Sequence, residues 1–334
     1  MSTIDQHAPH DQSGLDAEQP PRRVLLVDIS AFAHAAWHGD YPTMDSKGEC
    51  CRVIRGVVKR LHELREQFEW DLLVSVMDPE GGSLYRLGLY PDYKANRPES
   101  DPDFTRQKRA LYGQLKALGL NPILKAGIEA DDLLGTIAVK EAAAGSIVGV
   151  VSPDKDILQI VSDNISIIRP TRDANKNKIF EHYVPQAVFE RLGVWPEQVA
   201  DWLALQGDTS DNIPGVDKVG PTYATQWLQL HGTLENVMAN AHTIKGVRGK
   251  NLVEMLPMMP TIRLLTTILL DVEIERHEWS NGKASYAEAS RIANHLMLSD
   301  IHSDWSNESS EWGVEILSAP TAAPRSRSGW GAKM

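Results

Sequence analysis

The chain has 334 residues, of which 42% are hydrophobic and 24% are charged, and its formal net charge is −11. No window holds the roughly 20 consecutive apolar residues that span a bilayer, and the polar, acidic first twenty residues exclude a secretory signal. The only cysteines, Cys50 and Cys51, are adjacent, and a disulfide between neighbours is strained, so neither an oxidising compartment nor a zinc site is indicated. We expect a cytoplasmic globular protein that does not contact a membrane.

Apolar strands and amphipathic helices alternate in the first half of the chain. Residues 1–21 lack periodicity and are expected to form a disordered leader. Strands are predicted at 24–29, 72–77, 121–124, 146–151 and 165–169, and helices at 52–68, 103–118, 129–144 and 155–162. This alternation is typical of an α/β fold, with a mostly parallel sheet covered by helices on both faces.

Strand signals stop near Tyr183. Short helices joined by Gly, Pro and Asn turns are predicted at 185–192, 196–206, 220–230, 233–240, 248–256 and 258–270. The pattern therefore predicts an α/β domain over 22–184, an all-helical subdomain over 185–302, and a Ser-, Ala- and Pro-rich flexible tail over 303–334. In that tail, Trp305, Trp312 and Trp330 are either contacts for an unidentified partner or inert aromatic residues.

The positive charge is concentrated in two stretches despite the acidic total. Residues 85–125 carry eight basic and four acidic residues, a local balance of 8 − 4 = +4, and residues 51–65 carry five basic residues against Glu63 alone. Segregated charge of this kind favours a nucleic-acid-binding face over a uniformly acidic surface, although solvated helix faces would give the same pattern.

Nine acidic residues fall into five short clusters, most of them just after an apolar run or at the start of a helix. The nine are Asp28, Asp78, Glu129, Asp131, Asp132, Asp154, Asp156, Asp208 and Asp211. Because the carboxyl ends of parallel strands meet at one edge of a sheet, we expect these side chains to converge. Carboxylates so close together would repel one another unless cations lay between them, and hard oxygen ligands favour Mg²⁺ or Mn²⁺.

Each cluster taken alone is explained by helix capping or an ordinary turn. Five clusters at one edge are better explained by a two-metal centre, which clamps the attacking and leaving oxygens of a phosphodiester. The sequence contains neither a GxxxxGK[ST] nor a GxGxxG motif, nor a nucleophile and base at suitable spacing. Phosphodiester hydrolysis is therefore the predicted reaction class.

The blocks VLLVDIS, YRLGLYPDYKANRP, GIEADDLLG, VVSPDKDIL and GDTSDNIPGVDKVG occur in that order between Arg22 and Leu270. In these blocks the chain resembles the 5′ nuclease family, which includes the 5′-nuclease domain of bacterial DNA polymerase I, bacteriophage 5′→3′ exonucleases and flap endonucleases. No polymerase module follows, so we expect a stand-alone form.

The resemblance implies a PIN-like, resolvase-like fold whose nine carboxylates hold two Mg²⁺ ions, which Mn²⁺ can replace. It also implies that Lys94 and Arg86 contact the scissile phosphate, that residues 80–105 form an arch for the 5′ strand, and that Arg97, Arg106 and Arg109 contact the DNA backbone. Tyr93 is either an aromatic on which a terminal base stacks or a half-buried core ring.

The stretch IPGVDKVG fits a helix-hairpin-helix, or helix-three-turn-helix, element that grips duplex DNA. Its expected DNA-binding residues are Gly215, Val216, Lys218, Val219 and Gly220, with the two glycines allowing close approach of a phosphate. In relatives this hairpin also holds a monovalent cation, so K⁺ is an expected cofactor. Where many relatives have Lys-Thr after the hairpin, this chain has Thr222-Tyr223.

These observations together predict a monomeric 5′→3′ exonuclease and 5′-flap endonuclease. Its expected partner is DNA with a 5′ end or 5′ flap, or the RNA of an RNA–DNA hybrid, in replication or repair. Two alternatives stay open. One is a non-catalytic DNA-junction binding protein of the same fold, which would gain affinity by losing the carboxylates, and the other is an RNA-cutting PIN-type nuclease.

Overall fold

The computed structural model describes residues 20–39, 43–279 and 295. The predicted leader, except for its last two residues, and the predicted tail with Trp305, Trp312 and Trp330 lie outside this range. Among the helices within it, none is both long and apolar enough to cross a bilayer.

A five-stranded sheet with the order β2-β1-β3-β4-β5 forms the centre of the first half of the chain. The strands are β1 (Arg23–Asp28), β2 (Leu72–Val76), β3 (Ile147–Val151), β4 (Ile165–Arg172) and β5 (Lys178–Tyr183). The first four are mutually parallel, and β5 pairs antiparallel with β4. Their β-branched runs are buried on both faces, as parallel strands require, and the predicted mostly parallel α/β sheet is confirmed.

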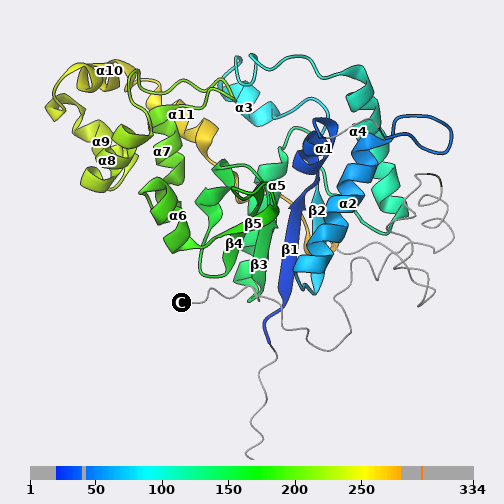
Figure 1. The fold of residues 1–334 in the computed structure, drawn as a ribbon. Coiled ribbons are helices and arrows are strands. Elements are labelled where there is room, and N and C mark those ends of the chain that lie inside the picture. The colour runs from blue at the N-terminus through cyan, green and yellow to red at the C-terminus, as the bar shows by residue number, and fades with distance from the viewer. Residues whose placement is uncertain (1–19, 40–42, 280–294, 296–334) are drawn as a thin grey trace, which may run out of the picture.

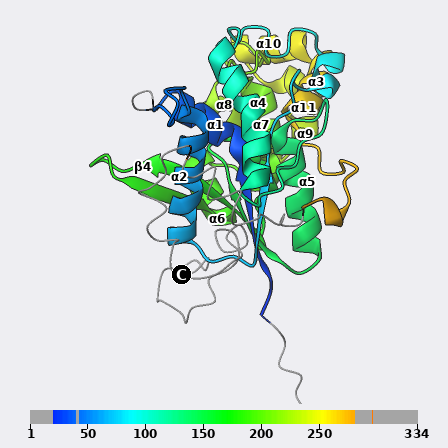
Figure 2. The ribbon, with the colours of Figure 1, turned by 90° about the vertical axis from the view of Figure 1, so that its right-hand side faces the viewer.

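Helices cover both faces of this sheet (Figures 1 and 2). Leu25 and Val27 of β1 pack on the side of α1 (Ile29–Trp37), α2 (Arg52–Gln67) and α4 (Pro102–Ala117). The alternate residues of β1, Val24 and Leu26, pack on the side of α5 (Ala130–Ala143). The alternation of side chains along β1 thus joins two separate apolar cores across one strand.

Four elements differ from the sequence prediction. The strand expected at 121–124 is a single parallel bridge between Ile123 and Val76, because Pro122 has no N–H to donate to a ladder. Strand β5 was not predicted, and its residues are largely half-exposed at the sheet edge. Helices α1 and α3 (Leu84–Leu89) were also missed; α1 follows β1 without an intervening turn, since Asp28 itself caps it.

The second half of the chain is helical, as predicted. Its helices are α6 (Pro185–Leu192), α7 (Val199–Gln206), α8 (Pro221–His231), α9 (Leu234–Ala239), α10 (Val247–Met255) and α11 (Met259–Thr266). Short 3₁₀ turns are η1 (Asp156–Ile160), η2 (Pro196–Gln198), η3 (Ala241–Thr243) and η4 (Arg276–Trp279). In Figure 1 these helices lie to one side of the sheet.

Helix α11 ends four residues earlier than the predicted 258–270, and the chain then runs back over α5. The Thr136 hydroxyl donates to the Leu269 carbonyl at 3.1 Å, and Lys140 Nζ donates to the Ile274 carbonyl at 2.7 Å. At the end of this segment, the fully buried Glu141 accepts hydrogen bonds from Arg276, Trp279 Nε1 and Ser146. One buried carboxylate therefore fastens the helical half to the α/β half.

We predict that Glu141→Gln lowers the free energy of unfolding near neutral pH by about 1–3 kcal/mol, because buried donors lose a charged acceptor. Although burial raises the pKa of Glu141, the hydrogen bonds from Trp279, Ser146 and Arg276 outweigh it, so the pKa is lowered in the folded state. The stabilisation should thus be complete above the unfolded Glu pKa of about 4.3 and be lost as the pH falls through the lower folded pKa. Denaturant unfolding of both proteins between pH 3 and 7 measures this; a gap that is constant over the whole range contradicts it.

Candidate active site

The sheet brings the predicted carboxylates to one edge. Asp28 is the last residue of β1, Asp78 follows β2 by two residues, and Asp154 follows β3 by three. Since these strands are parallel neighbours, their carboxyl ends lie side by side. Asp131 in the first turn of α5 joins them, because the Asp78 carboxylate accepts a 2.8 Å hydrogen bond from the Ala130 amide at the start of that helix.

Several of the clustered carboxylates also cap a helix or close a turn. Asp28 caps α1 by accepting from the Ala31 amide at 2.8 Å, and its second oxygen accepts from the Ser152 hydroxyl at 3.1 Å. Asp154 accepts from the Asp156 amide, and Asp208 from the Ser210 amide. The caps predicted as an alternative to a metal site are therefore real, and they fix the orientation of the carboxylates at the edge.

Four of the carboxylates, Asp28, Asp78, Asp131 and Asp154, form what we call the inner group. They have no ion pair with a basic side chain in the described part of the chain, and the charges of neighbouring members raise the pKa of Asp28 and of Asp131. Burial, followed by the charge of Asp78, raises the pKa of Asp28 to about 7. Burial, followed by the charges of Asp154, Asp28 and Asp78, raises the pKa of Asp131 well above its ordinary value.

The outer group consists of Asp156, Asp208 and Asp211, from η1 and the loop after α7. Burial and the charge of Asp154 raise the pKa of Asp156 to about 8, with smaller contributions from the other two members. Lys155 reaches across this group, donating to Asp208 at 2.6 Å. Burial raises the pKa of Asp208, but the bonds from Lys155 and Ser210 outweigh it and leave the pKa lowered.

The donor set fits divalent cations. One oxygen each of Asp131 and Asp156 is buried without any hydrogen-bond partner. The Asp156 oxygen lies 3.6 Å from Lys155 Nζ, whereas Asp131 has no ion pair in the described residues, and a buried unpaired carboxylate is costly unless an ion binds it. Within residues 20–39, 43–279 and 295, however, no three acidic, His or Cys side chains are already arranged around one point. The carboxylate oxygens would have to move closer together to coordinate an ion.

Arg86 and Asp132 do not lie where the sequence prediction expected them. Both are buried, and they form a two-pronged ion pair of 2.7 and 2.9 Å. Arg86 also donates to Glu129 and to the Leu265 and Thr267 carbonyls, while Asp132 accepts a further bond from the Leu269 amide. The N–H donors of Arg86 are therefore used within the protein and none is left for a scissile phosphate, while the Asp132 carboxylate is held by Arg86 and the Leu269 amide.

Lys94 and Tyr93 contact two of the predicted ligands. Lys94 Nζ donates to Glu129 and lies 3.5 Å from Asp211; burial lowers its pKa, but the charges of Glu129 and Asp211 outweigh burial and raise it, so it stays charged. The Tyr93 ring is buried, and its hydroxyl lies 3.0 Å from a Glu129 oxygen and 2.9 Å from an Asp211 oxygen, so its single proton can be donated to either carboxylate. This position favours the buried-ring interpretation of Tyr93 over base stacking.

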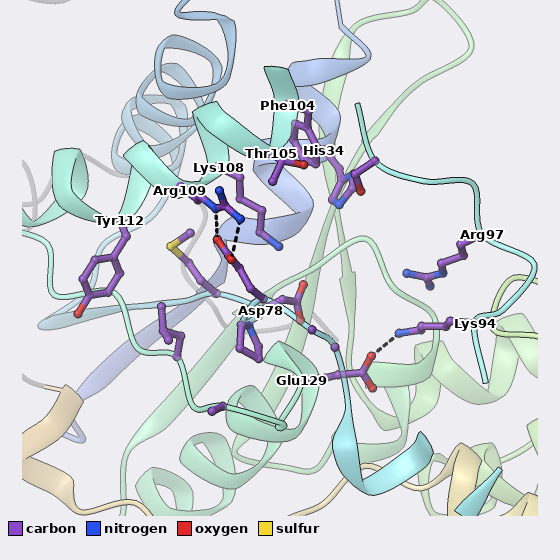
Figure 3. Close-up of a pocket in the computed structure, with 18 residues that line it drawn as sticks. His34, Asp78, Lys94, Arg97, Phe104, Thr105, Lys108, Arg109, Tyr112 and Glu129 are labelled. Atoms are coloured by element: carbon purple, nitrogen blue, oxygen red, sulfur yellow. Dashed lines mark hydrogen bonds and ion pairs between the residues drawn. The ribbon is translucent and has the colours of Figure 1, made fainter. Parts of the chain in front are cut away.

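A cavity of about 820 Å³ opens beside the inner group, between Asp78, Glu129 and α4 (Figure 3). Lys94, Arg97 and Lys108 line it with positive charge. Of the other predicted backbone contacts, Arg97 pairs with Asp211 at 2.6 Å, Arg109 with Glu80, and Arg106 with Asp103. The expected arch residues thus border the cavity.

The hairpin between α7 and α8 contains the five residues expected to bind DNA, but they differ in what they can contact. Val216 and Val219 are buried in the core, so only their backbones can face a ligand. A Cβ on Gly215 would lie 2.2 Å from the Gln206 carbonyl carbon, so this glycine is required for packing inside the protein. Around Gly220 there is open space, and Lys218 is exposed with a φ of 63°.

Sequence reasoning missed Lys155, whose position between two aspartates in PDKD was the available signal. It also missed the basic residues around α10, which lie beyond the recognised motifs.

The family models that match this chain cover most of it. The N-terminal resolvase-like domain of 5′-3′ exonucleases matches residues 23–193, and the C-terminal SAM fold of the same family matches residues 194–286. The 5′-3′ exonuclease of Aquifex aeolicus is 33% identical over 219 residues, which are 66% of this chain and 73% of that protein.

DNA polymerase I of Mycobacterium tuberculosis is 36% identical over 190 residues, covering 57% of this chain; the matched part is 21% of that longer polymerase. Among solved structures, bacteriophage T5 flap endonuclease in complex with DNA and metal ions is similar in fold. It has a TM-score of 0.60 and 17% identity, covering 83% of this chain and all of that one.

We predict opposite effects for one chemical change at two adjacent residues. Asp131→Asn should raise the melting temperature in EDTA by a few degrees, because it removes repulsion within the inner group. The same variant should reduce the stabilisation that added Mg²⁺ gives. Asp132→Asn should instead lower stability by about 1–3 kcal/mol, since it removes the charged two-pronged acceptor of the buried Arg86, which then keeps only Glu129 as an ion-pair partner. Thermal melts with and without Mg²⁺ measure both; destabilisation of equal size in the two variants contradicts the assignment.

Proposed function

Because the chain belongs to the 5′-3′ exonuclease family, we propose that it is a divalent-metal-dependent nuclease that degrades DNA from 5′ ends and cuts 5′ flaps. The observation that carries the proposal is the inner group, four carboxylates without a basic partner in the described residues. A protein that only bound DNA would be weakened by these charges next to a phosphate. Their retention favours a catalyst over the non-catalytic junction binder.

The proposed ligands of the ions are the inner group together with Asp156, Asp208 and Asp211. The charge of Asp154 acts on Asp131 of the inner group and on Asp156 of the outer group, so Asp154 is a proposed ligand beside members of both groups. When bound, two such ions would stabilise the attacking and leaving oxygens of a phosphodiester and lower the pKa of the attacking water. Asp132 is left out of this set, and Glu129 is assigned to orient Lys94.

Lys94 and Arg97 are the basic residues best placed to meet the substrate. Lys94 is half-buried between Glu129 and Asp211 and carries its charge to the edge of the cavity beside Asp78. A phosphate entering there would gain a charge-assisted hydrogen bond as its negative charge grows in the transition state. We assign the basic cavity in Figure 3 to the 5′ single strand.

The proposal also specifies the ion, the substrate and the cellular setting. We propose Mg²⁺ as the ion, with Mn²⁺ as a substitute, since all ligands are oxygens. The proposed substrate is a duplex with a 5′ end or flap, DNA or RNA–DNA hybrid, acted on by a monomer in the cytoplasm during replication or repair. K⁺ at the hairpin carbonyls stays a prediction from family resemblance.

The deciding experiment is incubation with Mg²⁺ and an end-labelled 5′-flap duplex, alongside a blunt duplex and a single strand, with product lengths mapped on a gel. Release of the intact flap shows endonuclease action, and mononucleotides show 5′ exonuclease action. The same mixture with EDTA is the control for metal dependence. No cleavage of any DNA, with cleavage of single-stranded RNA instead, would support the RNA-cutting alternative.

We predict that Asp154→Ala abolishes cleavage, because the inner group loses the proposed metal ligand whose charge acts on both Asp131 and Asp156. Binding of the flap duplex should remain measurable, since the duplex grip lies elsewhere. Single-turnover cleavage and fluorescence anisotropy separate the two effects. Turnover at the wild-type rate would remove Asp154 from the site.

Lys94→Ala should slow the single-turnover step by about 10²–10³-fold, the cost of losing one preorganised donor to a developing charge. Lys116→Ala is the matched control, because Lys116 lies in the same basic stretch but is exposed over the Tyr112 ring and does not line the cavity. Its rate should stay within about twofold of the wild type. Equal losses in both variants would indicate a general charge effect and not a role for Lys94.

A further inference from the structure

Helix α10 braces the hairpin between α7 and α8 through two side chains. Arg248 Nε donates to the Lys218 carbonyl at 2.8 Å, and Asn251 Nδ2 donates to the Asp217 carbonyl at 2.8 Å. Both acceptors are in the turn that precedes α8. The two bonds fix the turn from a segment 30 residues or more further along the chain.

The Arg248 guanidinium is held in a second way, over the ring of Tyr223. Its Cζ lies 3.7 Å from the ring centroid, and such a stack restricts the plane of the guanidinium. Tyr223 is the second residue of Thr222-Tyr223, the pair that stands where many relatives have Lys-Thr. Position 222 therefore carries no charge in this chain, and the positive charge near it comes from Arg248, which lies over the ring of Tyr223.

The geometry leaves part of this guanidinium available. Nε is used by the Lys218 carbonyl, and for the Nη atoms no acceptor is found within the described residues. Arg248 is half-buried, so its orientation is fixed while its outer edge reaches the surface. An orientation set by a backbone bond and a ring is what a two-pronged contact with a phosphate requires.

The surroundings of Arg248 are basic in an otherwise acidic chain. Residues 243–251 contain Lys245, Arg248 and Lys250 and no acidic residue. Lys245, Lys250 and the neighbouring Lys218 are exposed and form no ion pair among the described residues. Asp217, whose carboxylate lies 3.3 Å from Asn251 Nδ2, is an acidic residue beside them. The basic residues outnumber it, and such a local excess on a protein of net charge −11 indicates an anionic partner.

We propose that Arg248, oriented by Tyr223 and the Lys218 carbonyl, donates through its Nη atoms to a backbone phosphate of the duplex held by the hairpin. This inference rests on the proposed function and names a DNA contact outside the motifs that carry the family resemblance. Lys218, whose backbone the same arginine braces, adds charge beside that phosphate. Arg248 thereby supplies a cation beside position 222, which here is the uncharged Thr222.

The rival role for Arg248 is a brace alone, and salt dependence separates the two. A lost phosphate contact lowers the slope of log affinity against log salt by about 0.9, whereas a lost brace leaves the slope unchanged. Binding of a labelled 5′-flap duplex is measured by fluorescence anisotropy in EDTA at several salt concentrations. Arg248→Ala should weaken binding about tenfold and lower the slope by about 0.9.

Three further variants of the full chain complete the test. Arg248→Lys keeps the charge and should restore the slope with intermediate affinity. Asn251→Ala removes the other brace without a change of charge and should keep the wild-type slope. Arg22→Gln changes the charge equally at the opposite edge of the sheet, where Arg22 is exposed, and should alter neither quantity.

A wild-type slope in Arg248→Ala overturns the proposal, whether affinity falls or not. An equal fall in slope for Arg22→Gln overturns it as well, because the effect would then be one of net charge. The wild-type protein is measured first: if it neither binds nor cleaves flap DNA, the proposed function itself has failed, which is a separate result.

Discussion

Repulsion among carboxylates held at one edge of a rigid sheet is the constraint on which the surrounding structure depends. Hydrogen bonds to the starts of α1 and α5 hold Asp28 and Asp78 in place, so neither can swing away from Asp131 and Asp154. The cost is visible in the raised pKa values of Asp28 and Asp131. Basic side chains neutralise the charge of the outer carboxylates. In the described chain no basic side chain pairs with the inner group, so a cation is attracted to the inner group.

The adjacent residues Asp131 and Asp132 show how one helix serves both the site and the core. Successive residues of a helix point about 100° apart, so Asp131 joins the inner group while Asp132 faces the helical half. There Asp132 receives Arg86 and the Leu269 amide, and Arg86 in turn binds the Leu265 and Thr267 carbonyls. The edge of the active site and the seam between the two halves of the chain therefore depend on the same turn of α5.

The sequence was sufficient for the parallel sheet, the helical second half and the convergence of the carboxylates, because apolar periodicity and strand ends follow local rules. It could not separate Asp131 from Asp132, since both are acidic residues at the start of one helix and only the packing of α11 decides which is buried. The same holds for Arg86, whose acceptors at Leu265 and Thr267 are distant in sequence. Gly215 looked like an opening for a phosphate, yet the backbone at Gln206 fills that space.

The loop from Asp208 to Gly220 connects the three parts of the proposed machinery. The Lys94 amide donates to the Asp211 carbonyl, and Asn96 donates to the Thr209 carbonyl, so the arch segment is attached to the loop that carries the outer carboxylates. Four residues after Asp211, Gly215 packs against the end of α7 and begins the hairpin. Four residues span at most about 14 Å, and this stretch is pinned at both ends. Under the proposed function, this short covalent segment sets the distance between two phosphates, the one bound by the hairpin and the one to be cut. The cleavage position would then be a property of the fold.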